Sequence, residues 1–95
     1  METTYHIITD ITTTQGLLEV GSFYLGNDVE FATAAFDNLK GLPNSNDAVI
    51  RMSLVETAKG SIPVTLNSIG CILNEYAENC KIITRDVFKF YNLEK

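Results

Sequence analysis

The chain has 95 residues, with 12 acidic and 7 basic side chains and a formal net charge of −5. This charge disfavours nucleic acid as a partner, because a protein that binds the phosphate backbone needs a basic face to displace counterions. It also disfavours docking on anionic membranes, and no apolar run approaches the length of a membrane span. With 45% hydrophobic and 20% charged residues, the composition is typical of a globular protein, and residues 1–95 are expected to form a single domain.

The N-terminal residues and the two cysteines bear on location. The first ten residues lack the basic residues and the long apolar core of a signal peptide, so a soluble, cytoplasmic protein is expected. Cys71 and Cys80 are nine positions apart and match no CxxC pattern for metal or redox chemistry. A reducing compartment argues against a disulfide, and a zinc site with His6 would need a fourth ligand from scattered carboxylates. We therefore expect buried or half-buried thiols, no metal and no cofactor.

The chain begins with two predicted strands that should pair as a hairpin. Residues 4–11 are rich in Ile, Thr and Tyr, which favour strands, although neither face of this segment is cleanly apolar. A turn over 12–16 leads to a second strand over 17–25, in which Gly21 can mark a bulge.

A helix is predicted over residues 28–40. Asn27 is the expected N-terminal cap, with Glu30 three residues later, and Gly41 is the expected C-terminal stop. An apolar stripe at helical spacing runs through Ala32, Ala35, Phe36 and Leu39. Residues 42–47 follow as a polar loop.

Residues 48–66 form a second predicted hairpin, around which the rest of the chain should pack. One apolar face comes from Ile50, Met52 and Leu54, and another from Ile62, Val64 and Leu66. Gly60 can take the positive φ that the turn needs. Pro63 has no N–H to donate, so the second strand should begin there or turn that side to a sheet edge.

The last third of the sequence predicts two short helices. An apolar stripe predicts the first over 72–80, residues 81–83 connect, and Thr84 caps the second over 85–93. The element order is then ββαββα plus a short C-terminal helix. The simplest fold is α+β, a four-stranded, mainly antiparallel sheet with helices on one face.

The C-terminal helix carries the candidate interface. Aromatic side chains flanked by arginine are enriched at protein interfaces, and here the set is Arg85, Phe88, Lys89, Phe90 and Tyr91. Alternatively, the aromatic rings close the protein's own core, as a small domain requires. If they form an interface, a symmetric homodimer is the expected outcome.

No combination of residues predicts a reaction. His6 is the only histidine, and no serine lies in a GxSxG motif. Glu75 and Glu78 share one side of a helix, as solvated carboxylates usually do. The two glycines before the helix at 28–40 lack the Lys-Ser/Thr of a phosphate loop. We assign no catalytic residues.

Three hypotheses for function follow. The first is a small non-enzymatic protein-interaction module whose partner is a protein and can be a second copy of itself. The second is a small-molecule binder or minor enzyme with a pocket between sheet and helices, formed by His6, Tyr24, Glu75 and Tyr76. The third is an acidic partner or inhibitor of a basic protein, acting through Glu19, Asp28, Glu30 and Asp37.

Overall fold

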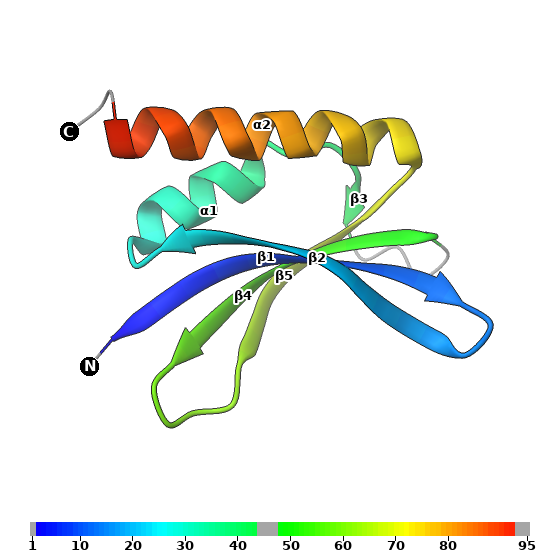
Figure 1. Ribbon diagram of the computed structural model, residues 1–95, viewed down its shortest axis with the longest axis horizontal. Coiled ribbons are helices and arrows are strands. Elements are labelled where there is room, and N and C mark those ends of the chain that lie inside the picture. The colour runs from blue at the N-terminus through cyan, green and yellow to red at the C-terminus, as the bar shows by residue number, and fades with distance from the viewer. Residues whose placement is uncertain (1, 44–47, 93–95) are drawn as a thin grey trace.

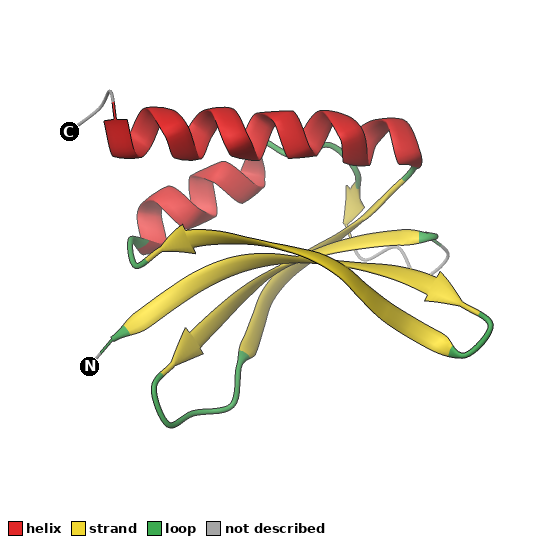
Figure 2. Cartoon of the chain, in the orientation of Figure 1, coloured by secondary structure: helices red, strands yellow, loops and turns green. Residues whose placement is uncertain are grey.

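The computed structural model describes residues 2–43 and 48–92. Its elements, shown in Figure 1, are β1 (Thr3–Thr13), β2 (Gly16–Gly26), α1 (Val29–Asp37), β3 (Leu42–Pro43), β4 (Ile50–Ala58), β5 (Val64–Cys71) and α2 (Leu73–Asn92). The strands form one antiparallel sheet in the order β2-β1-β4-β5-β3. Both helices lie on the same side of this sheet (Figure 2). The predicted α+β class is confirmed, while residues 44–47 of the predicted loop and the predicted helix end at Leu93 lie outside the described residues.

The sheet has five strands where the sequence predicts four. β3, predicted as loop, pairs with Ile69 and Gly70 of β5. Gly41 explains this close approach, because its φ of 153° is one that side chains rarely tolerate. A Cβ atom at Gly41 would also lie 2.7 Å from the carbonyl oxygen of Gly70. Only glycine therefore lets the chain come this near to β5.

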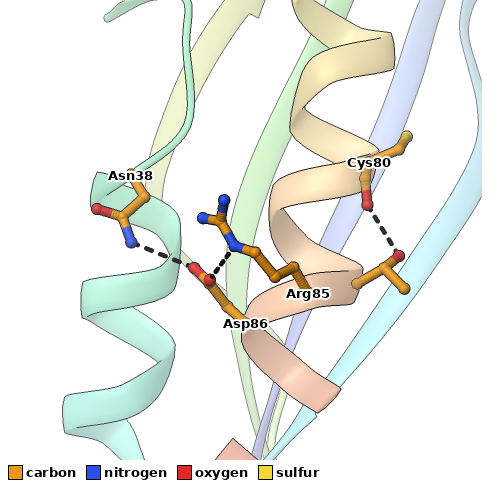
Figure 3. Close-up of polar contacts among 5 residues, drawn as sticks. Asn38, Cys80, Arg85 and Asp86 are labelled. Atoms are coloured by element: carbon orange, nitrogen blue, oxygen red, sulfur yellow. Dashed lines mark hydrogen bonds and ion pairs between the residues drawn. The ribbon is translucent and has the colours of Figure 1, made fainter. Parts of the chain in front are cut away.

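The C-terminal third forms one continuous helix, so the predicted pair of short helices is wrong. Ile82 and Ile83 are buried and extend the apolar face across the expected break. Thr84, the expected cap, instead lies within the helix, where its hydroxyl donates to the carbonyl oxygen of Cys80 at 2.8 Å (Figure 3). No glycine or proline occurs between Ile72 and Asn92 to stop the helix.

Helix α1 buries Ala32, Ala35 and Phe36, as its apolar spacing predicts. Its N-cap is Asp28 rather than Asn27, because the carboxylate of Asp28 accepts a 3.0 Å hydrogen bond from the backbone N–H of Phe31. The helix ends at Asp37, three residues before the predicted end. Aspartate and asparagine cap equally well, so the sequence leaves a choice between adjacent residues.

The core lies between the sheet and the two helices. Its sheet side includes Ile7 of β1 and Met52 and Leu54 of β4, which confirms the predicted inward face of β4. The second predicted face is wrong, since Ile62, Val64 and Leu66 are exposed. The tip of the β4–β5 hairpin points away from the helices (Figure 1), and a register shift between Leu54 and Val55 interrupts the alternation.

A buried amide ties α2 to the segment that follows α1. Asn79 is fully buried, and its Oδ1 accepts a 2.8 Å hydrogen bond from the backbone N–H of Lys40. Its Nδ2 donates to the carbonyl oxygen of Lys40 at 2.8 Å and approaches the sulfur atoms of Met52 and Cys71. Both backbone groups of one residue are thus held by one side chain.

Replacing Asn79 with alanine should destabilise the protein, because it leaves the N–H and C=O of Lys40 without these partners. We expect the free energy of unfolding to fall by roughly 1 to 3 kcal/mol, measured by urea denaturation. Asn74→Ala, at an exposed position of the same helix, is the control and should change stability by less than about 0.5 kcal/mol. Equal losses in the two variants would contradict a structural role for the amide.

Candidate functional site

An apolar hollow opens at the end of the sheet where α2 begins. We call it the end hollow; its volume is about 820 Å³, and it is lined by Ile11, Leu42, Ala48, Val49, Ile50, Gly70, Cys71, Ile72, Leu73 and Glu75. These residues come from β1, β3, the start of β4 with the two residues before it, the end of β5, and the first turn of α2 with Ile72 before it. Residues 44–47, which join two of these segments, lie outside the described residues and are not counted in the site.

Strand register explains why this end of the sheet is apolar. Leu18, Ile11, Ile50 and Cys71 pair in a row across β2, β1, β4 and β5. The chain then turns at Ile72 into α2. Ile50 and Cys71 are buried at the floor, while Leu42, Val49, Ile72 and Leu73 form a rim on which each side chain is between 64% and 71% exposed.

The polar groups of the end hollow are already engaged. The carboxylate of Glu75 accepts a 3.0 Å hydrogen bond from the backbone N–H of Ile72. The thiol of Cys71 donates to the carbonyl oxygen of Lys40 at 3.4 Å. Burial, and secondarily the charge of Glu75, raises the pKa of Cys71 to about 11, although the hydrogen bond from Asn79 acts in the opposite direction. At neutral pH the thiol is therefore uncharged, and the hollow offers mainly apolar contacts.

Two members of the predicted interface, Phe90 and Tyr91, contact other elements of the same chain, although Tyr91 stays 37% exposed. Phe90 stacks on Phe31 of α1 with 4.1 Å between ring centroids and 12° between planes. The Tyr91 hydroxyl donates a 2.7 Å hydrogen bond to the carbonyl oxygen of Leu25. The same hydroxyl lies so close to Gly26 that a Cβ atom on residue 26 would collide with it. These two rings help to fasten α2 to α1 and β2.

The other three members of the predicted interface remain on the surface. Phe88 is 57% exposed, and Lys89 and Arg85 are also exposed. Arg85 pairs with Asp86 at 3.2 Å, and Asp86 also accepts a 3.2 Å hydrogen bond from Asn38 of α1 (Figure 3). The structure thus separates the predicted interface into an anchored part and an exposed part.

The residues of the predicted pocket lie on different elements and contact one another only in part. His6 and Tyr24 are cross-strand neighbours on β1 and β2, with ring centroids 5.2 Å apart. Glu75 lies at the end hollow, and Tyr76 packs against the core from α2. Burial raises the pKa of Tyr76, and a hydrogen bond with Cys80 raises it further. His6 therefore does not line the end hollow with Glu75.

The predicted acidic residues are also dispersed. Asp28 caps α1, Glu30 and Asp37 are exposed at the two ends of α1, and Glu19 is exposed on β2.

Within the part of the chain that the structure describes, no three His, Cys, Asp or Glu side chains cluster as a metal site would require. Neither of the helices described here is both long and apolar enough to cross a membrane.

The sequence gives no direct signal for the end hollow. Its aliphatic residues lie in four separate segments, and the residues of β3 are predicted as a loop. A row of apolar residues across four strands becomes visible only once the strand register is known. One feature of the sequence points toward the end hollow: the apolar stretch 70–73, where a strand ends and a helix begins.

Tyr91→Phe should weaken the attachment of α2, because it leaves the carbonyl oxygen of Leu25 without its donor. We expect a loss of roughly 1 kcal/mol in the free energy of unfolding at neutral pH. Burial first, then Tyr24 and Asp28, raises the pKa of Tyr91 above its ordinary 10.0. Its stabilising contribution should therefore be complete below pH 10 and decline as the pH rises further. Tyr24→Phe, at a 59% exposed ring, is the control, and an equal loss there would contradict the role of the bond.

Alkylation should distinguish the two cysteines. Because only thiolates react with iodoacetamide, buried Cys71, whose pKa is about 11, should stay unmodified at about pH 8. The half-buried Cys80 should react first, and both should react once urea unfolds the chain. Peptide mass spectrometry measures the two rates. Faster modification of Cys71 than of Cys80 in the folded protein would contradict the closed floor of the end hollow.

No protein-family model, curated protein sequence or solved structure matches the chain. Among the described residues, the end hollow joins an exposed apolar rim to a buried floor, and it is the candidate functional site.

Proposed function

We propose that the protein is a small non-enzymatic protein-interaction module whose end hollow receives apolar side chains of a partner protein. The observation that supports this proposal is the rim, formed by Leu42, Val49, Ile72 and Leu73. Monomeric proteins rarely expose large contiguous apolar patches, and such patches commonly mark contact sites. A partner side chain inserted between the rim residues would remove apolar surface from water on both sides.

The strength of such a contact can be bounded. Covering one aliphatic side chain contributes about 1.5 to 3 kcal/mol, whereas association costs about 4 to 15 kcal/mol in lost freedom of motion. Covering the four rim residues would therefore offset the association cost only if that cost lies in the lower half of its range. The end hollow acts in this proposal as the central anchor of an interface whose surroundings supply the remaining contacts.

A second copy of the chain is one partner that fits this proposal. The tail aromatics Phe90 and Tyr91 pack within the protein, so self-association would use the end hollow in place of those rings. Two copies meeting at the same hollow would form a symmetric dimer. A different protein with a protruding apolar side chain is the other possible partner.

A small apolar molecule is the alternative occupant. The volume of about 820 Å³ lies within the range of small-molecule sites, about 300 to 1,000 Å³. The single carboxylate, Glu75, is hydrogen-bonded to Ile72 and gives little to orient a polar substrate. Native mass spectrometry of the purified protein tests this alternative, because a co-purified ligand would add a discrete mass that denaturation removes.

Leu73→Glu should abolish partner binding without unfolding the protein. The leucine is 71% exposed, so its replacement leaves the core intact, but the new carboxylate would lose its hydration at the contact. We expect self-association, measured by light scattering over a dilution series, or capture of a partner, measured by quantitative pull-down, to be lost. Circular dichroism checks the fold.

Ile62→Glu is the matched control. Ile62 is 85% exposed on the β4–β5 hairpin and does not line the end hollow. The Ile62→Glu substitution introduces the same charge at another exposed aliphatic residue, so association should persist. Association that is equally strong in both variants would rule out the end hollow as the contact site.

A further inference from the structure

β2 forms one edge of the sheet, and among the described strands it pairs with β1 alone. Two stretches of β2 pair regularly, Gly16–Glu19 and Gly21–Tyr24, and the register shifts on either side of the second, between Thr9 and Asp10 and between Tyr5 and His6 of β1. The outer side of an edge strand presents N–H and C=O groups that another extended chain can bond. The edge of β2 at Gly21–Tyr24 therefore offers a short, regularly paired stretch for such bonding.

A groove of about 370 Å³ separates β2 from the second half of α2. Its apolar walls are Phe23 and Tyr24 on the strand and Ile83, Val87 and Phe88 on the helix. Tyr24 and Phe88 are both more than half exposed, although each could contribute a large ring to a contact. A chain laid along β2 would direct every second side chain toward this groove.

A second hollow on α2 adjoins the groove and contains two basic residues. It shares Phe88 with the groove and continues along α2 past Lys81 and Arg85. Lys89 and Asp86 line a different hollow, beside α1. Arg85 pairs with Asp86 through its Nε atom, but the arginine side chain is 58% exposed, and its remaining N–H groups can bond a ligand carboxylate.

We propose that this groove binds an extended acidic and apolar peptide segment of a partner protein, by strand addition to β2. Its apolar side chains would enter the groove, and its carboxylates would lie near Lys81 and Arg85. A second copy fits less well, because the strands with backbone left open for pairing carry only one acid, Glu19: these are β2 and the part of β5 that β3 does not cover. The proposal does not rest on the end hollow, which lies at the other end of α2.

Selection from a phage-displayed library of random dodecapeptides against the full chain is the first test. We expect enriched sequences in which apolar residues alternate with aspartate or glutamate. A synthetic copy of one such peptide should bind in calorimetry, and its affinity should fall as salt is raised. No enrichment over the bare support, or enrichment of basic peptides, would overturn the proposal.

Variants then locate the binding site of the selected peptide. Phe88→Glu should weaken its affinity by about tenfold or more, and the double variant Lys81→Glu/Arg85→Glu should do the same and remove the salt dependence. Asn74→Glu, at an exposed residue of the same helix that lines neither the groove nor the end hollow, is the control and should bind as the parent does. Unchanged binding by Phe88→Glu, or loss with Asn74→Glu, would overturn the proposal, and circular dichroism confirms that each variant is folded.

Backbone methylation of the peptide tests strand addition itself. A strand bonded along one edge uses the N–H groups of alternate residues, so methylating one alternate set should weaken binding by about tenfold or more. Methylating the other set should leave binding intact. Tolerance of both sets, or equal loss with both, would exclude strand addition.

Self-association of the protein itself is a separate test of what occupies the groove. Self-association that Phe88→Glu abolishes and Leu73→Glu preserves would assign the groove to a second copy and overturn the peptide proposal.

Discussion

The hydrogen bonds between Asn79 and the backbone of Lys40 hold the architecture of the functional end together. The carbonyl oxygen of Lys40 accepts from the amide of Asn79 and from the thiol of Cys71. One residue of the α1–β3 connection is thus bonded to α2 and to β5. Because Gly41 follows directly and approaches β5 closely, these bonds determine where Leu42 enters the rim. The end hollow is therefore supported by buried polar contacts as well as by apolar packing.

The opposite end of α2 is fixed by aromatic rings. Phe90 stacks on Phe31, and Tyr91 reaches across to the carbonyl oxygen of Leu25. Gly26 makes room for that hydroxyl, since any side chain there would collide with it. A helix held at both ends keeps its position over the sheet. Both proposed contact surfaces are therefore formed before any partner binds, which lowers the entropy that binding must overcome.

The sequence reveals local structure well and long-range structure poorly. The spacing of Ala32, Ala35 and Phe36 predicts α1, and alternation through Met52 predicts the inward face of β4, because both patterns depend only on neighbouring residues. Thr84 misleads, because a threonine hydroxyl can cap a helix or bond one turn back within it. β3, the exposed tip of the second hairpin and the end hollow all depend on which strands meet, and no local pattern specifies that.

The two proposed surfaces differ in ways that would select different partners. The end hollow contains one carboxylate, Glu75, whereas the groove beside β2 adjoins Lys81 and Arg85. A basic residue on a ligand would therefore be tolerated better at the hollow, and an acidic residue at the groove. Glu75 and Lys81 are six residues apart on α2, about 9 Å along the helix axis, which is close to the screening length of about 8 Å at physiological salt. Charges bound at the two surfaces would therefore be only partly screened from each other, so a ligand at one surface would influence which charge is favoured at the other.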